Sequence, residues 1–251
     1  MVVLGTTAET PTLSEAEKKE ILSFVIRQNN KRLPVVAGIG GNNTEAVIRS
    51  VREYPVVGID GILSVVPYYN KPNQEALYQH FKAIAASTEK PLILYNVPGR
   101  TATNMAAATA FRLATDCKNI VAIKEASGNM AQCMDLVQNA PAGFSVLSGD
   151  DDLALAQAAL GFSGIISVAA NCFPRHFSEM IRLAGKNEFT AAREHHYQML
   201  PAIRMLFEEG NPAGVKAMLS HQGLCENHLR LPLIPASASL EDRLASFAGI
   251  R

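Results

Sequence analysis

Lys124 is the residue whose surroundings point most directly to chemistry. It lies near the end of the apolar segment 119–127 (NIVAIKEAS), whose β-branched residues predict a strand buried on both faces. An ammonium group that leaves water is destabilised unless it is paired or loses its proton, and a neutral amine is the nucleophile that forms a Schiff base with a carbonyl. From this segment alone the commoner outcome is structural, with Lys124 paired to Glu125 or reaching solvent.

Other polar side chains follow the predicted strands at their C-terminal ends. The segments are 5–9 (GTTAE), 67–70 (PYYN) and 95–100 (YNVPGR), and they supply the candidates Thr6, Thr7, Tyr68, Tyr69, Tyr95 and Arg100. In a barrel of βα units these strand ends meet on one face, where active sites are built. Structural roles stay open for each, because threonines cap helices, tyrosines pack at interfaces and a surface arginine forms ion pairs.

The elements expected to position these residues alternate between strands and helices. Short apolar runs predict strands at 1–5, 33–38, 61–67, 91–95, 120–124, 144–148 and 164–168. Ser14, Asn43 and the acidic run 150–152 precede helical patterns, and Gly161 is expected to end the last of them. Repeated βα units imply a parallel sheet, open or closed.

After Pro174 the sequence becomes helical. Helices are expected within 175–185, 189–209, 212–224 and 240–248. We therefore divide the chain into a (β/α) barrel catalytic domain at 1–174, which is N-terminally incomplete, and a C-terminal helical region at 175–251.

Composition limits the kinds of partner. The 251 residues carry no net formal charge, with 48% hydrophobic and 18% charged residues, which suits a large core. The absence of a basic cluster argues against nucleic acid and anionic membranes and favours a small substrate. The chain shows no signal peptide or membrane span, and its four cysteines are scattered, so a cytoplasmic location is expected.

No metal or cofactor is expected. The acidic run 150–152 is interpreted as a helix cap rather than a cation site, and His195 and His196 are expected to face solvent. Segment 38–42 (GIGGN) lacks the third glycine and the lysine of phosphate-binding loops, and no serine nucleophile elbow is present.

Taken together, five motifs in order resemble the dihydrodipicolinate synthase family of pyruvate-dependent class I aldolases, of which N-acetylneuraminate lyase is a sister. They are GTTAE (5–9), PYYN (67–70), YNVPGRT (95–101), IKEA (123–126) and LSGDD (147–151). The resemblance extends to LRLPL at 229–233. It implies a (β/α)8 TIM barrel that lacks its first strand and helix here, with a C-terminal helical extension.

The resemblance also implies a reaction. Lys124 would form a Schiff base with pyruvate, and the resulting enamine would attack L-aspartate 4-semialdehyde to give 4-hydroxy-tetrahydrodipicolinate, a step of lysine and diaminopimelate biosynthesis. Tyr95 would move protons through a relay with Thr6 and with Tyr69 of a neighbouring subunit, since a phenol has an ordinary pKa of about 10. Three further residues would bind the substrates, namely Thr7 (pyruvate carboxylate), Arg100 (second substrate carboxylate) and Ile166 (backbone carbonyl beside the imine).

The sequence departs from the family pattern in three respects. The family has further residues before the Gly-Thr-Thr motif, so a shortened barrel with unpaired edges is expected. Ala8 replaces a glycine, which would strain a backbone of positive φ. Glu15, Lys18 and Ala46 occupy the family's lysine-effector positions, and Lys18 would repel a cation, so lysine inhibition is expected to be weak; micromolar binding of lysine in a calorimetric titration would contradict this.

Two alternatives accompany the main hypothesis. One is a related pyruvate-dependent aldolase with another acceptor, which Arg100 and the Thr6–Thr7 pair argue against. The other is a catalytically impaired, truncated barrel. A homo-oligomer, dimer or tetramer, is expected because Tyr69 would act only across a subunit interface.

Overall fold

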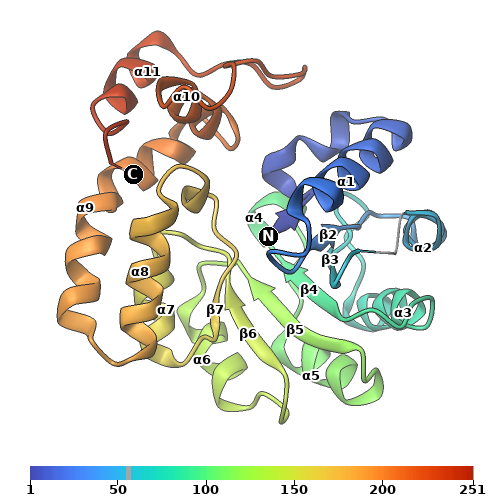
Figure 1. Cartoon of the computed structure of the whole chain (residues 1–251). Coiled ribbons are helices and arrows are strands. Elements are labelled where there is room, and N and C mark those ends of the chain that lie inside the picture. The colour runs from blue at the N-terminus through green and yellow to red at the C-terminus, as the bar shows by residue number, and fades with distance from the viewer. Residues whose placement is uncertain (55–57, 251) are drawn as a thin grey trace. The chain divides into compact units, whose positions relative to one another are not determined.

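The computed structural model describes residues 1–54 and 58–250, which form two compact units, Met1–Gly149 and Asp150–Arg251. The first unit is an α/β structure and the second is largely helical, as Figure 1 shows by colour along the chain. The α/β class and the parallel strands expected from the sequence are confirmed. The expected division at 174/175 stays a prediction.

Among its described residues, the first unit has six strands that are all parallel and pair in sequence order. They are β1 (Val2–Val3), β2 (Val36–Gly38), β3 (Gly61–Val65), β4 (Leu92–Asn96), β5 (Ile120–Glu125) and β6 (Ser145–Ser148). Strands that neighbour one another in sequence order throughout are typical of a barrel, whereas in a doubly wound sheet the strand order reverses at one point. All C-terminal strand ends therefore lie along one edge.

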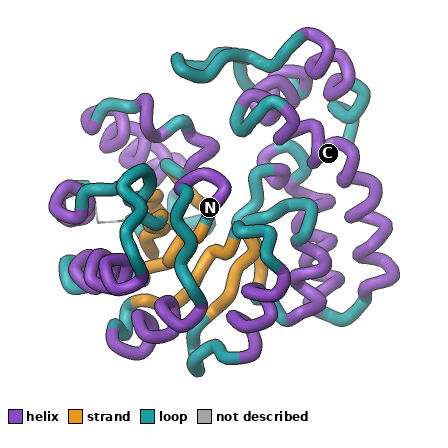
Figure 2. The backbone as a smooth tube through the Cα atoms, turned by 180° about the vertical axis from the view of Figure 1, so that it is seen from behind, coloured by secondary structure: helices purple, strands orange, loops and turns teal. Residues whose placement is uncertain are grey.

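Helices connect these strands and cover the outside of the sheet, where Figure 2 shows them in purple around the orange strands. They are α1 (Glu15–Asn29), α2 (Thr44–Glu53), α3 (Gln74–Ala85), α4 (Pro98–Thr101), α5 (Ala107–Asp116) and α6 (Met130–Gln138), with the short 3-10 turns η1 (Thr6–Ala8) and η2 (Thr10–Thr12) after β1.

Two predicted helix starts are confirmed by their caps. The Ser14 hydroxyl accepts from the Glu17 N–H and the Glu17 carboxylate accepts from the Ser14 N–H, which makes a capping box. The Asn43 side chain accepts from the Ala46 N–H at the start of α2.

A one-residue irregularity sets the register between β4 and β5. Leu92 pairs with Ile120, but Ile93 pairs with Ala122, so β5 has one extra residue at this point. Because side chains alternate between the faces of a sheet, a shift of one residue exchanges the faces. As a result Tyr95 lies opposite Lys124 and Asn96 lies opposite Glu125.

The second unit packs its helices around a core of its own, in which Phe173, Phe177 and Met199 are buried. Its elements are α7 (Ala154–Leu160), β7 (Gly164–Ile165), η3 (Ala169–Asn171), α8 (Pro174–Gly185), α9 (Phe189–Glu208), α10 (Ala213–His221) and α11 (Ala238–Ala245). The four helices expected after Pro174 are thus confirmed, and Gly161 ends α7 in the left-handed conformation as expected.

Two expectations about the second unit were wrong. The acidic run does not cap α7, whose N-cap is Leu153 without a side-chain bond. Instead the buried Asp151 carboxylate accepts the backbone N–H groups of Val168 and Ala169. His196 does not face solvent, since only 9% of it is exposed and burial lowers its pKa.

Candidate active site

Lys124 and Tyr95 form the centre of the candidate site. Both are buried, with 7% and 6% of their surfaces exposed, and they are register partners on neighbouring strands. The Lys124 Nζ lies 4.2 Å from the centroid of the Tyr95 ring. The structural alternative in which Lys124 reaches solvent is therefore wrong, and the lysine side chain is buried against the tyrosine ring.

Gly149, directly after β6, makes room for the lysine. A Cβ atom placed on Gly149 would lie 2.8 Å from Cε of Lys124 and 2.6 Å from Cβ of Ala126. The Gly149 N–H donates to the carbonyl oxygen of Glu125 at 2.7 Å. A larger residue here would push against the lysine chain and the backbone of β5.

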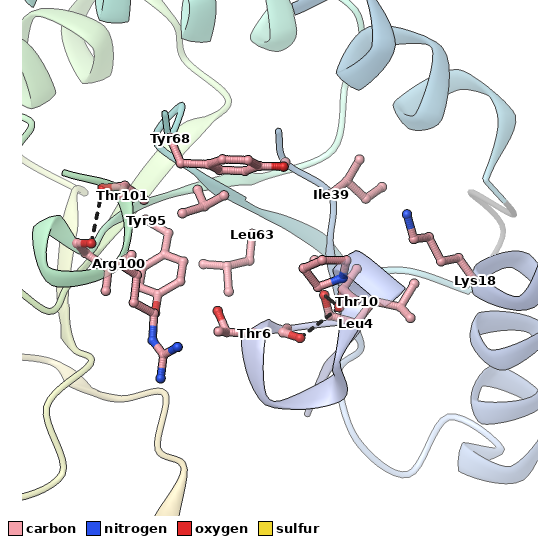
Figure 3. A pocket seen from close by; sticks show the side chains of 16 residues that line it. Leu4, Thr6, Thr10, Lys18, Ile39, Leu63, Tyr68, Tyr95, Arg100 and Thr101 are labelled. Atoms are coloured by element: carbon pink, nitrogen blue, oxygen red, sulfur yellow. Dashed lines mark hydrogen bonds between the residues drawn. The ribbon is translucent and has the colours of Figure 1, made fainter. Parts of the chain in front are cut away.

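A pocket of about 330 Å³ opens beside Tyr95 within the first unit (Figure 3). Three of the predicted site residues line it, namely Thr6, Tyr95 and Arg100. In Figure 3 these three lie toward one end of the pocket, and Lys18 and Ile39 lie toward the other. Lys124 does not line this pocket but contacts the ring of Tyr95, so the predicted nucleophile and the pocket meet at this tyrosine.

The turn after β1 presents the threonine pair. Thr6 and Thr7 belong to η1, and Thr10 fixes the turn by donating its hydroxyl proton to the carbonyl oxygens of Leu4 and Gly5. Thr6 is exposed toward the pocket, whereas Thr7 is partly buried and is not part of the lining.

The expected strain at Ala8 is absent. The left-handed residue of this turn is Glu9, at φ 52°, while Ala8 closes the 3-10 turn η1 that precedes it. Alanine is therefore compatible with the backbone at position 8.

Arg100 is held on the short helix α4, which begins at Pro98. Proline suits the first helical turn because its missing N–H would have no partner there. The Thr101 hydroxyl donates to the carbonyls of Val97 and Thr103 and fixes the end of this turn. The exposed guanidinium of Arg100 is thus placed at the pocket by an ordered backbone.

Two further predicted site residues are not part of the pocket lining. Tyr69 is 87% exposed and has a left-handed backbone at φ 73°, which is unusual for a tyrosine. Ile166 directly follows β7 in the second unit. The roles of both residues stay predictions.

The sequence patterns missed the glycines beside the pocket. Gly38 and Gly40 both line it, and a Cβ on Gly38 would lie 2.1 Å from the Leu4 carbonyl oxygen, while one on Gly40 would lie 2.8 Å from the Val65 nitrogen. Segment 38–42 lacks the pattern of a phosphate-binding loop, but glycine at a strand end also indicates close approach of neighbouring backbones.

A second lysine, Lys18, lines the pocket, and its Nζ lies 2.7 Å from a Glu15 oxygen. Among residues 1–54 and 58–250, no group of three or more His, Cys, Asp or Glu side chains is arranged to hold a metal ion. No helix in these same ranges has the length and apolar character needed to cross a membrane.

Comparison with known proteins shows which family this chain resembles along its length. The model of the dihydrodipicolinate synthetase family matches residues 1–249. The 4-hydroxy-tetrahydrodipicolinate synthase of Parabacteroides distasonis is 53% identical over 94% of this chain and 79% of its own length.

Solved structures agree with the sequence comparison. The dihydrodipicolinate synthase of Aquifex aeolicus matches with a TM-score of 0.95 and 44% identity, over 98% of this chain and 84% of that one. The chloride-inhibited enzyme of Acinetobacter baumannii in complex with pyruvate matches with a TM-score of 0.95 and 41% identity, over 100% of this chain and 87% of that one. The chain therefore belongs to the dihydrodipicolinate synthetase family of class I aldolase-type lyases.

Proposed function

We propose that this chain condenses pyruvate with L-aspartate 4-semialdehyde to 4-hydroxy-tetrahydrodipicolinate, through a Schiff base on Lys124. The observation that carries the proposal is the buried Lys124 amine 4.2 Å from the Tyr95 ring, beside a pocket that Thr6 and Arg100 also line. The relative from Acinetobacter baumannii, whose structure holds pyruvate, supports the first substrate.

The first half of the reaction uses the amine. Lys124 Nζ attacks the keto carbon of pyruvate, and loss of water from the adduct gives the imine. Loss of a proton from the pyruvate methyl group gives the enamine. In this proposal the Thr6–Thr7 turn binds the pyruvate carboxylate with hydroxyl and backbone N–H groups. Ile166 would offer its backbone carbonyl beside the imine.

The second half of the reaction forms the carbon–carbon bond. The enamine carbon attacks the aldehyde, and the alkoxide that forms takes a proton delivered through Tyr95. The amino group of the second substrate then attacks the imine carbon, which closes the ring and releases Lys124. Arg100 would hold the carboxylate of this substrate, because its forked donors match a planar carboxylate.

The barrel and its assembly are part of the proposal. The sequential order of the six parallel strands supports a (β/α)8 barrel plan. We propose a homo-oligomer, a dimer or tetramer, in which Tyr69 reaches the site of a neighbouring subunit. The strong exposure of Tyr69 supports this assignment.

A cytoplasmic location is also proposed. Its support is that none of the four cysteines forms a disulfide, which suits a reducing compartment.

A condensation assay tests the proposed substrates. The purified chain is mixed with pyruvate and either aspartate semialdehyde or an aldehyde without a carboxylate, and pyruvate consumption is followed. We expect turnover with the semialdehyde and a 10- to 100-fold higher KM for it in R100K, because lysine cannot form the paired hydrogen bonds. R112K serves as the matched control, since Arg112 pairs with Glu75 on the surface. Equal turnover of both aldehydes would contradict the assignment of the acceptor.

A further inference from the structure

The residues that follow Tyr95 and Lys124 form a buried polar network on the opposite face of the sheet. Asn96 and Glu125 are both fully buried and are register partners of β4 and β5. The Asn96 Nδ2 donates to the Glu125 Oε2 at 3.0 Å. The two strands that carry the reacting side chains are therefore joined by a side-chain bond directly beside them.

Both oxygens of Glu125 accept hydrogen bonds. Its Oε1 accepts the Ser127 N–H at 2.8 Å, and its Oε2 accepts the Gln132 Nε2 at 3.0 Å in addition to Asn96. Gln132 belongs to α6, so the carboxylate joins two strands and a helix. A buried carboxylate without such donors would be strongly destabilising.

Asn96 is equally constrained. Its Oδ1 accepts the Met105 N–H at 2.9 Å, and its Nδ2 also donates to the Asn104 Oδ1 at 2.8 Å. Turning the amide would place its NH2 group against the Met105 N–H, so the network admits one orientation. The loop after α4 is thereby fixed to β4.

We propose that the Asn96–Glu125 pair is a positioning device for the reaction, which fixes the separation of the Lys124 amine and the Tyr95 phenol. This inference rests on the proposed function. Tyr95 and Asn96 are consecutive, as are Lys124 and Glu125, so a bond between the second members limits sliding of the first members. Neither Asn96 nor Glu125 touches substrate in this proposal, and both act through the strands.

The register of the sheet explains why the Asn96–Glu125 hydrogen bond is needed. The irregularity between Leu92 and Ile93 is what aligns Tyr95 with Lys124. Without it, alternation would place the two side chains on opposite faces. A hydrogen bond between Asn96 and Glu125 stabilises this register at the end of the strands where the reaction would occur.

Two single variants and their double variant test the positioning role of the Asn96–Glu125 pair. In E125Q the amide keeps one acceptor and presents NH2 to donor groups, and N96D places two carboxylates face to face. Each is expected to lower kcat 10- to 100-fold, since small misplacements of reacting groups have effects of this size. The KM for pyruvate should stay within about threefold, because the Thr6–Thr7 turn lies on another strand.

The double variant N96D/E125Q restores a donor and an acceptor in reversed order, with the new amide at position 125 donating to the new carboxylate at position 96. We expect at least a tenfold recovery of kcat over E125Q. E75Q, on the exposed carboxylate that pairs with Arg112, is the matched control and should retain the parent kcat. Melting curves followed by circular dichroism measure the folded fraction of each variant.

The outcomes distinguish a failure of the positioning role from a failure of the proposed function. A parent chain that forms no pyruvate adduct contradicts the function itself. An active parent with unchanged kcat in both single variants contradicts only the positioning role of Asn96 and Glu125. A double variant that folds but does not recover kcat over E125Q contradicts it as well. Should E125Q not fold, the double variant decides, and a kcat of less than about a tenth of the parent value overturns the proposal.

Discussion

Tyr95 connects the parts of the candidate site at the scale of single residues. Its ring contacts the Lys124 amine and also lines the pocket with Thr6 and Arg100. A phenol in this place can deliver protons to groups formed at the imine and in the pocket, which agrees with the shuttle role expected from the family resemblance.

Replacing Tyr95 by phenylalanine separates its two contributions. Y95F keeps the ring over Lys124 but loses the hydroxyl, so kcat for condensation should fall about 10²- to 10⁴-fold while the pyruvate adduct still forms. Steady-state assays and borohydride trapping measure the two steps. Y197F, at an exposed tyrosine of the second unit, is the control. Condensation at the parent rate in Y95F would remove Tyr95 from the mechanism.

Sequence patterns selected Lys124, Tyr95, Thr6 and Arg100 because each lies at, or a few residues after, the C-terminal end of an apolar run. Their catalytic roles stay predictions. The patterns misjudged Asp151, whose carboxylate accepts backbone N–H groups of Val168 and Ala169, and His196, which is buried. Both errors arise from contacts between residues distant in sequence, which local periodicity does not encode.

At the scale of elements, strand ends and register position the chemistry. Caps and apolar runs predicted where strands and helices begin, as Ser14 and Asn43 show. The extra residue in β5 opposite Leu92 and Ile93 has no sequence signal, yet it decides that Tyr95 and Lys124 share a face. The pairing of strands therefore had to come from the structure.

Gly149 gives the first prediction at this scale. In G149A the added Cβ would lie 2.8 Å from the Lys124 Cε and 2.6 Å from the Ala126 Cβ, so the lysine chain must shift. We expect kcat to fall about 10- to 100-fold, measured in the condensation assay. G185A is the control, because a Cβ there meets no atom within 4 Å. Parent-like kcat in G149A would show that this glycine does not place the lysine.

His80 gives a second prediction, on the stability of α3. Burial lowers the pKa of its imidazole from 6.5 to about 4, and its Nδ1 lies 2.8 Å from the Thr44 hydroxyl oxygen. The unfolded chain binds this proton near pH 6.5 and the folded chain only near pH 4. The contribution of His80 to the free energy of unfolding is therefore fully present above pH 6.5, and about 3 kcal/mol of it is lost as the pH falls from 6.5 to 4.

The variant H80Q isolates this contribution. Denaturant unfolding at several pH values should show a smaller loss of unfolding free energy between pH 6.5 and 4 than the parent shows. H221Q, at an exposed histidine, should keep the parent dependence. The same slope in H80Q and the parent would mean that His80 is not the buried neutral group described here.

At the scale of the whole molecule, the proposal requires subunits to share a site. Tyr69 is 87% exposed and has a left-handed backbone at φ 73°. Its proposed role across an interface can be tested by mixing two inactive variants, K124A and Y69A.

Hybrid dimers of these variants contain one intact site, with Lys124 from the Y69A chain and Tyr69 from the K124A chain. After the variants are unfolded together and refolded, random pairing should restore about a quarter of the parent activity. Each variant refolded alone is the control. No recovery, despite dimers visible in ultracentrifugation, would place Tyr69 outside the neighbouring site.

The central claim is that the buried amine of Lys124 forms an imine with pyruvate. The most direct measurement is reduction of the chain with borohydride in the presence of pyruvate, followed by intact and peptide mass spectrometry. The account predicts one added pyruvic acid less one oxygen atom per chain, located on Lys124 and absent in K124A. A folded chain that gains no mass, or gains it on another lysine, would contradict the account.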